Sequence, residues 1–269
     1  MPLAICATPI GNLDDVTLRV LGELREADVV LCEDTRRTRI LLDRHEISAR
    51  LTSYHRHNEA ARTAQILPRL EAGERIALVS DAGLPGLNDP GARLIAAALD
   101  HGLPVTVLPG PSAVETALVA SGLGAERYQF LGYLPRGERA LAALWEELAR
   151  WPHAAVAFES PQRIGRSLAA LSRVMPERRV AVCRELTKRF EEIVRGKAAD
   201  VAERFVEPPK GEITVVLGPA PGEVDPSGEQ EGVSAVAELV AAGVGRRAAA
   251  DLVARLTGLP RNTLYRSSL

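Results

Sequence analysis

Short apolar runs of strand length recur along the chain, and most are followed by a sharp turn and then by apolar residues at helical spacing. In the first half, the predicted strands cover residues 3–10, 28–32, 51–54, 75–80 and 103–108. A helix over 91–100 joins the last two, with Asp89 as its expected capping residue and Gly102 after its end. This alternation predicts a parallel α/β sheet in which the ends of strands 75–80 and 103–108 open side by side. Small ligands bind at such strand ends.

The same pattern restarts near residue 123 and predicts a second α/β domain. Its expected strands cover residues 128–133, 154–158, 179–183, 190–194 and 212–217, and its expected helices cover 138–150, 164–175 and 198–205. Before it, a helix over 112–121 begins at Ser112, a favourable capping residue.

Residues 218–232 break the pattern with four glycines, three prolines and four acidic residues, which is typical of a flexible linker. Three short helices over 234–242, 246–257 and 261–266 then resemble a small helix-turn-helix unit. We therefore expect an N-terminal α/β domain (1–122), a second α/β domain (123–217), an acidic linker (218–232) and a basic helical module (233–269).

Charge narrows the range of partners. The formal net charge of −2 argues against a nonspecific polyanion binder, so a nucleic-acid surface has to be local. Residues 232–269 carry five arginines against two acidic residues, and a basic helical unit of this kind favours RNA contact. The expected contacts are Arg246, Arg247 and Arg261. A docking or dimerising tail is the alternative.

Several classes of protein are excluded. The chain has neither a long apolar run nor a secretory signal, so we expect a cytoplasmic protein without membrane contact. Its three cysteines are far apart in apolar runs, which predicts buried reduced thiols and no metal site. Neither G-x-G-x-x-G nor G-x-x-x-x-G-K-[ST] follows the first strand, so an ordinary nucleotide loop is not expected.

The loops at the strand ends carry the candidate chemistry. Residues 8–11, 80–83 and 109–112 are small and turn sharply, which lets backbone groups approach a compact ligand, and Asp81 adds a carboxylate. Charged residues cluster at three other strand ends, over 33–37, 159–163 and 184–188. For Glu33, Asp34 and Arg36, a helix cap with a surface ion pair is the alternative interpretation.

Seven motifs in order carry a family resemblance: TPIGNLDDVTLR, ADVVLCEDTRRT, SDAGLPGLNDPG, LPGPSA, FLGYLPR, FESPQRI and RELTKRFEE. Together they resemble the tetrapyrrole-methylase superfamily, and within it the branch that methylates the 2′-oxygen of a cytidine in bacterial 16S rRNA. The resemblance implies two α/β domains with S-adenosylmethionine in the cleft between them, a homodimer, and a decoding-centre cytidine of the small ribosomal subunit as substrate.

The resemblance also implies site residues. The methyl donor is expected to contact a set of loop and strand-end residues: Pro9, Gly11, Ser80, Asp81, Ala82, Gly83, Ser112, Ala113, Phe158, Leu186 and Ile213. The chemistry of methyl transfer, and not the resemblance, selects the expected catalytic set of Glu33, Asp34, Arg36, Glu159 and Lys188.

Glu33, Asp34 and Glu159 are the alternatives for a base that takes the hydroxyl proton. Arg36, Arg163, Arg184 and Lys188 are suited to phosphates or to the hydroxyl, with Arg163 and Arg184 as expected RNA contacts. Two positions depart from the usual motifs: Asn88 and Arg56 stand where Ser and Glu are more common.

Two other functions remain open at this point. Other members of the same superfamily methylate a tetrapyrrole carbon, but the EDTR and ESPQR motifs and the helical tail argue against this activity. A non-catalytic binder of nucleic acid that senses a ligand is the alternative outside the enzymes.

Overall fold

The computed structural model describes residues 2–86, 88–124, 126–220, 226–257 and 259–267. The chain forms two compact units, Met1–Pro219 and Ala220–Leu269, and each is described by itself. The first unit contains both predicted α/β halves, and the second contains the predicted helical module. Among the described residues, no helix is both long enough and apolar enough to cross a membrane.

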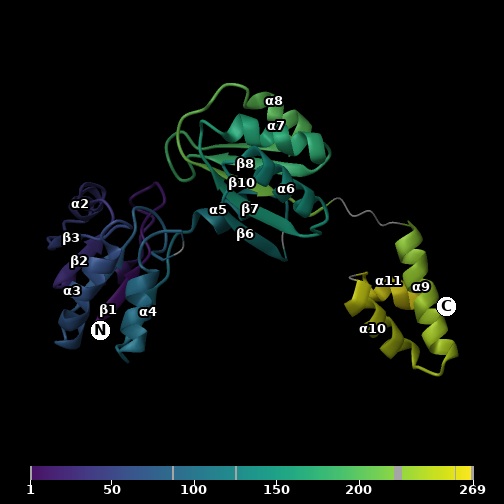
Figure 1. The fold of residues 1–269 in the computed structure, drawn as a ribbon, viewed down its shortest axis with the longest axis horizontal. Coiled ribbons are helices and arrows are strands. Elements are labelled where there is room, and N and C mark those ends of the chain that lie inside the picture. The colour runs from purple at the N-terminus through teal and green to yellow at the C-terminus, as the bar shows by residue number, and fades with distance from the viewer. Residues whose placement is uncertain (1, 87, 125, 221–225, 258, 268–269) are drawn as a thin grey trace. The chain divides into compact units, whose positions relative to one another are not determined.

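The first half is a five-stranded parallel sheet with helices around it (Figure 1). The strands are β1 (Leu3–Cys6), β2 (Val29–Cys32), β3 (Leu51–Ser53), β4 (Ile76–Val79) and β5 (Val105–Leu108). The helices are α1 (Leu18–Glu26), α2 (Thr35–Arg44), α3 (Glu59–Glu71), α4 (Ala92–Asp100) and α5 (Ala113–Ser121). Strands β1, β2 and β4 are buried throughout because helices cover both faces.

The strand order β3-β2-β4-β1-β5 corrects one expectation. Strands β4 and β5 do not pair with each other, because β1 lies between them and pairs with both in parallel. The chain crosses from one side of β1 to the other after β4, and such a crossing is where open α/β sheets bind ligands. Three loops therefore meet at this edge instead of two.

The second half is a mixed sheet of order β6-β7-β10-β8-β9. Its strands are β6 (Tyr128–Tyr133), β7 (Ala154–Glu159), β8 (Arg179–Arg184), β9 (Glu192–Lys197) and β10 (Ile213–Leu217), and its helices are α6 (Glu138–Ala149), α7 (Ile164–Val174) and α8 (Ala198–Arg204). Only β6 and β7 pair in parallel. One face of the sheet packs on α6 and α7 through Trp145, Leu168 and alternate strand residues such as Val182 and Val215.

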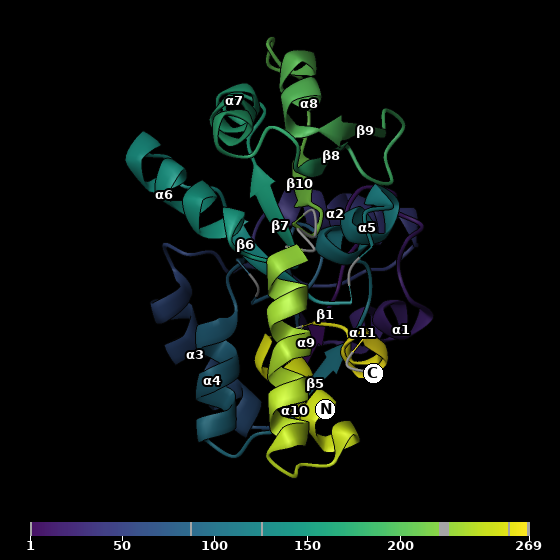
Figure 2. The same cartoon turned by 90° about the vertical axis from the view of Figure 1, so that its right-hand side faces the viewer.

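Helix α5 joins the two halves. It follows β5 in the chain but packs on β10 and β8 of the second sheet, on the face opposite α6 and α7 (Figure 2). Its Ala117 lies in one apolar cluster with Cys183 and Val216 of that sheet and with Ile10 from the loop after β1. The three cysteines are free and buried, as predicted, and burial raises the pKa of the Cys6 and Cys183 thiols to about 12.

The second unit consists of helices α9 (Pro226–Ala241), α10 (Arg246–Thr257) and α11 (Arg261–Ser267), around a small core that includes Val236, Val253 and Leu264. Helix α9 begins inside the predicted linker, so residues 226–232 are helical; residues 221–225 of that segment lie outside the described residues. Glycine and proline content misled the prediction, because proline is tolerated at the first position of a helix.

Gly232 is part of this core and not of a linker. A Cβ atom placed on it would lie 2.6 Å from Leu259 Cδ1 and 2.9 Å from Leu264 Cδ2, closer than apolar atoms pack. The missing side chain lets α9 approach α11.

We expect Gly232→Val to destabilise the second unit by about 1–3 kcal/mol, the usual cost of overpacking. Hydrogen exchange of the amides in α9–α11 would accelerate, while amides of β1 and β4 stay protected. Gly22→Val is the control, because a Cβ at Gly22 of α1 meets open space. Unchanged exchange in the Gly232→Val protein would contradict the packing.

Candidate functional site

The loops after β1 and β4 are locked together at the carboxyl edge of the first sheet. Thr8 and Gly83 exchange backbone hydrogen bonds of 2.8 and 3.0 Å. The Thr8 hydroxyl donates to the Ser80 carbonyl (3.0 Å), and the Ser80 hydroxyl donates to the Gly83 carbonyl (3.1 Å). Gly83 has φ +78°, a backbone conformation that favours glycine. These bonds fix the position of Asp81 between the loops.

A cavity of about 710 Å³ lies against these loops and the second sheet. Eight residues of the predicted donor set line it: Asp81, Ala82, Gly83, Ser112, Ala113, Phe158, Leu186 and Ile213. They come from the ends of β4, β5, β7, β8 and β10, so the fold gathers residues that lie far apart in sequence. Gly110 sits close to the β1 loop, where a Cβ would lie 2.9 Å from Ala7 Cβ.

An aromatic group on this cavity was not predicted. Tyr128, Phe130 and Tyr133 of β6 line it with Phe158, and the Phe130 and Tyr133 rings lie 5.0 and 5.6 Å from the Phe158 ring, edge to face. A shift in register between Phe130 and Tyr133, with Gly132 at φ +66°, lets both rings reach Phe158. In a regular strand, Phe130 and Tyr133 would lie on opposite faces, so their spacing in the sequence did not indicate that both rings contact Phe158.

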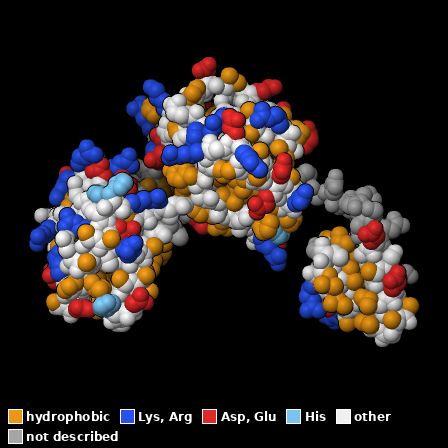
Figure 3. Space-filling view, in the orientation of Figure 1, with side chains coloured by type: hydrophobic (Ala, Val, Ile, Leu, Met, Phe, Trp, Pro, Cys, Tyr) orange, Lys and Arg blue, Asp and Glu red, His pale blue; other side chains and the backbone are white. Residues whose placement is uncertain are grey.

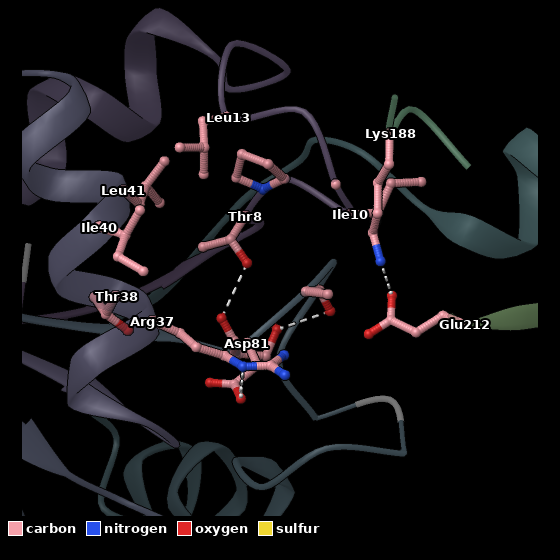
Figure 4. Close-up of a pocket in the computed structure, with 14 residues that line it drawn as sticks. Thr8, Ile10, Leu13, Arg37, Thr38, Ile40, Leu41, Asp81, Lys188 and Glu212 are labelled. Carbon is pink, nitrogen blue, oxygen red and sulfur yellow. Dashed lines mark hydrogen bonds and ion pairs between the residues drawn. The ribbon is translucent and has the colours of Figure 1, made fainter. Parts of the chain in front are cut away.

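A second cavity of about 190 Å³ shares a wall with the first, formed by Ile10, Arg37, Asp81, Ala82 and Glu212. In Figure 4, Thr38, Ile40 and Leu41 of α2 form one side of it, and Lys188 and Glu212 lie on the other. Three predicted donor contacts, Pro9, Gly11 and Ser80, line this smaller cavity and are absent from the lining of the larger one.

The loop after β8 closes against the loop after β1. The Thr187 hydroxyl accepts from the Asn12 amide (2.9 Å), and Gly11 has no room for a Cβ, which would lie 2.5 Å from Lys188 Cγ. We call this contact of Gly11 and Asn12 with Thr187 and Lys188 the clasp. Glu185 and Thr187 have φ of +54° and +64°.

Lys188, predicted to contact a phosphate or the hydroxyl, is held by two carboxylates. Its Nζ donates to Glu185 Oε1 and to Glu212 Oε2, each at 2.8 Å. Burial lowers the pKa of the ammonium, but the bonds to these two carboxylates outweigh burial and raise it overall. Arg184, a predicted RNA contact, is similarly engaged: it donates to Glu192 (3.0 Å) and to the Lys210 carbonyl (3.2 Å).

Asp34 has the alternative role of a helix cap. Its Oδ1 accepts from the Arg36 amide at the start of α2 (2.9 Å), and its carboxylate pairs with the exposed Arg36 guanidinium at 2.7 Å. The Arg36 side chain lowers the pKa of Asp34 to about 2. A carboxylate of such low basicity is a poor acceptor for a hydroxyl proton. Asp34 is therefore poorly suited to be the base, and Arg36 is tied to the cap.

Glu159 and Arg163, predicted as a catalytic residue and an RNA contact, form an ion pair with each other. Glu159 is 2% exposed; its Oε1 accepts from the Ser160 amide (2.7 Å) and pairs with Arg163, and its Oε2 accepts from the Ser167 hydroxyl (2.6 Å). Arg163 also donates to the Leu134 carbonyl (3.1 Å). Glu159 lines the larger cavity, but both of its carboxylate oxygens are engaged in these bonds, and the Arg163 guanidinium is engaged with Glu159 and Leu134.

Asp89 was expected to cap α4, but Gly91 occupies that position, and its amide donates to Glu59 (3.0 Å). Asp89 instead lines the larger cavity. Burial raises the pKa of its carboxyl to about 6, and the negative charges of Glu33 and Asp81 contribute to the same rise.

Asp81 accepts from the Asp34 amide (3.1 Å) and pairs with Arg37 at 3.6 Å. We call Glu33, Asp81 and Asp89 the rim carboxylates: Asp81 and Asp89 line the larger cavity, and Glu33 lines neither cavity but is close enough to raise the pKa of Asp89.

The two departures from the family motifs lie next to each other. An Arg56 guanidinium nitrogen donates to the Asn88 carbonyl, and Asn88 lines the larger cavity. Asn88 has φ +61°, which asparagine tolerates better than most residues. Its side chain faces Gly132 of β6, where a Cβ would lie 3.2 Å from Asn88 Oδ1. The two residues therefore act together on the shape of one cavity wall.

The tail arginines belong to the second unit. Arg247 is exposed, Arg246 is half-buried at the start of α10, and Arg261 pairs with Asp251. Figure 3 shows cationic side chains gathered along one side of this unit, beside apolar ones. Across the part of the chain that the structure describes, no group of three or more histidine, cysteine or acidic residues is arranged to hold a metal ion.

Comparison with known proteins is consistent with this geometry. Residues 2–202 match the family model of Tetrapyrrole (Corrin/Porphyrin) Methylases. The chain is 42% identical to a "Ribosomal RNA small subunit methyltransferase I" of Mesorhizobium japonicum, over 99% of this chain and 91% of that protein. A protein of the same name from Thermotoga maritima is 42% identical over 97% of its own length but only 80% of this chain. About a fifth of this chain thus has no counterpart there.

Solved structures share the fold at low identity. The methyltransferase CobJ is 22% identical, with a TM-score of 0.62, over 81% of this chain and 94% of that one. The uroporphyrin-III C-methyltransferase of Thermus thermophilus, complexed with S-adenosylhomocysteine, is 20% identical, with a TM-score of 0.57. The match covers 80% of this chain and 96% of that one. These likenesses bear on the fold alone.

The raised pKa of Asp89 predicts a pH-dependent stability. A carboxyl whose folded pKa is about 6, above its ordinary value of about 4, stabilises the fold fully below pH 4 and loses that contribution as the pH rises through 6. We expect Asp89→Asn to melt at a higher temperature than wild type at pH 8 and at the same temperature at pH 4, measured by calorimetry.

Asp34→Asn is the matched control, because it is expected to change the melting temperature in the opposite direction. Because the Asp34 pKa is lowered to about 2, its charge stabilises the fold above its ordinary pKa, and this contribution disappears as the pH falls toward 2. The Asp34→Asn protein is thus expected to melt lower than wild type at neutral pH. If Asp89→Asn melted at the wild-type temperature at pH 8, the negative charge of Asp89 would not destabilise the fold.

Proposed function

Because the chain belongs to the tetrapyrrole (corrin/porphyrin) methylase family, we propose that it methylates the 2′-oxygen of a cytidine in 16S rRNA of the small ribosomal subunit. The family and its relatives show that the chain is an S-adenosylmethionine-dependent methyltransferase that acts on ribosomal RNA. The proposal that it methylates a cytidine 2′-oxygen is supported by two adjoining cavities, one large and one small, that share Asp81.

The larger cavity fits the methyl donor in size and chemistry. S-adenosylmethionine supplies an electrophilic methyl group on a positively charged sulfur. The aromatic group of Tyr128, Phe130, Tyr133 and Phe158 offers apolar surface to an adenine ring. Asp81 and Asp89 offer negative charge to a cationic ligand, and the closely packed Gly110 lets the backbone of the β5 loop approach it.

In the proposed reaction, positioning supplies most of the acceleration. The bound donor would supply an electrophilic methyl group, and the ribose oxygen would bond to that carbon as the carbon–sulfur bond breaks and leaves its electron pair on sulfur. The locked loops at Thr8 and Gly83 hold the walls of both cavities in place, so the two reactants meet in a fixed geometry.

The hydroxyl proton has to leave as the new bond forms, and the rim carboxylates are the groups that we propose receive it. Asp89 is suited to accept a proton, since its pKa of about 6 lies near neutral pH. This assignment keeps Glu33 from the sequence-based set and replaces Asp34 and Glu159, whose carboxylates are engaged in a cap and in a buried pair.

We also propose that the enzyme is a homodimer that works in the cytoplasm, where ribosomes are assembled. Strand β5 is an edge strand of the first sheet, and its Val107 is 52% exposed; Val119 on α5 is 81% exposed. Exposed apolar side chains on an edge strand and on a helix favour association with a second copy.

The proposed function is tested by incubating the protein with methyl-labelled S-adenosylmethionine and small ribosomal subunits that lack the modification. Nuclease digestion and mass spectrometry are expected to recover the label as 2′-O-methylcytidine. Label on a cytosine base would contradict the 2′-oxygen as acceptor. Label on a porphyrinoid, with none on ribosomal subunits, would establish the tetrapyrrole alternative instead.

Removing the second unit separates donor binding from RNA binding. A chain that ends at Pro219 retains both cavities, so its affinity for S-adenosylmethionine should stay within twofold of wild type in calorimetric titration. Its KM for small subunits should rise, because the arginines of α10 are lost. The Thermotoga relative, which matches only 80% of this chain, supports a separable tail.

The double variant Arg246→Ala/Arg247→Ala in the full chain is the matched control for charge. If both arginines contact phosphates, the slope of log affinity against log salt falls by about one to two. An unchanged KM for both the shortened and the double-variant proteins would favour a docking role for the tail.

A further inference from the structure

We infer that the smaller cavity is the binding site for the target nucleoside itself, which enters unstacked from its RNA neighbours. The inference rests on the proposed function and deepens it by assigning an acceptor site. It concerns the cavity between the loop after β1, helix α2 and the clasp, drawn in Figure 4.

The shared wall sets where the two reactants can meet. Ile10, Asp81 and Ala82 line both cavities, and the larger one already fits the donor in size and chemistry. A methyl group leaving the larger cavity across this wall enters the smaller one. The acceptor oxygen therefore has to come from a group held in the smaller cavity, within reach of Asp81.

The size of the smaller cavity favours one nucleoside. Its volume of about 190 Å³ is about a quarter of the 710 Å³ of its neighbour, which leaves room for a ribose and a pyrimidine but not for stacked bases. Enzymes that act on one nucleotide of a structured RNA or DNA take it out of the stack, and a cavity of this size requires the same.

The lining matches a nucleoside in chemistry as well. Leu13, Ile40 and Leu41 give an apolar surface for the faces of a base or sugar. Arg37 lies at the wall shared with the donor cavity, and its side chain is 60% exposed, so its guanidinium can reach a phosphate as well as Asp81.

The wall opposite α2 is rigid. Gly11 is packed against Lys188 and the Leu186 carbonyl, which a Cβ would approach to 2.5 and 2.7 Å, and Lys188 is fixed between Glu185 and Glu212. Side chains added on α2 therefore narrow the cavity and cannot be accommodated by a shift of the clasp.

The test uses two substitutions on α2. Ile40→Trp adds bulk at a residue that is 59% exposed, so folding is not at risk, and Leu41→Phe adds bulk at a buried residue of the same wall. Leu18→Trp on α1 is the matched control, because Leu18 is 85% exposed and lines neither cavity.

Two readouts keep this inference separate from the proposed function. With small ribosomal subunits, both α2 variants should lose at least tenfold in kcat/KM, while their affinity for S-adenosylmethionine stays within twofold. With cytidine 3′,5′-bisphosphate and S-adenosylhomocysteine present, saturation-transfer NMR should detect binding to wild type and Leu18→Trp and a much weaker signal for both variants.

Wild-type rates and wild-type nucleotide binding in both variants would overturn the inference. So would a loss of donor affinity that parallels the loss of rate, because the smaller cavity would then belong to the donor site. If wild type methylates no ribosomal subunit but binds the nucleotide in a manner that Ile40→Trp abolishes, the proposed function fails and the nucleoside site stands.

Discussion

The site depends on the apolar cluster that unites the two halves of the first unit. Ile10 and Ala82, from two loops of the parallel sheet, pack with Ala117 of α5 and with Cys183 and Val216 of the mixed sheet. Because α5 follows β5 in the chain but packs on the second sheet, this helix is itself part of the packing that unites the two halves. Ile10 and Ala82 also line both cavities, so the packing of this cluster fixes the wall that the two cavities share.

Much of the fold followed from the sequence because buried strands are short, apolar and bounded by turns. Strand β6 has the predicted bounds, and α10 also matches its prediction, whereas β1 is four residues shorter at its carboxyl end because the Thr8 loop already bends toward Gly83. Composition could not reveal that α9 starts at Pro226, since glycine and proline are permitted in a first turn. Strand order was also beyond the sequence pattern: nothing local requires β1 to lie between β4 and β5.

The sequence indicated which loops line the cavities, but it did not indicate what the individual charged side chains there do. The turns around Asp81 and Ser112 were located because small residues at strand ends are a local signal. The roles of charged residues depend on partners far away in the chain. Glu159 is a structural carboxylate because Ser167 and Arg163 face it, and Asp89 is a cavity residue because Gly91 replaces it at the start of α4. The aromatic group on β6 required a bulge that spacing does not indicate.

The loop after β8 that carries the clasp has an energetic cost in its own backbone. Glu185 and Thr187 hold left-handed conformations that cost non-glycine residues about 1–3 kcal/mol each, and for a β-branched residue such as Thr187 this is a marked outlier. The bonds to Asn12, Glu191, Lys188 and Glu212 offset this conformational cost. Because several bonds share one strained turn, the loss of any of them weakens the whole turn and not a single contact.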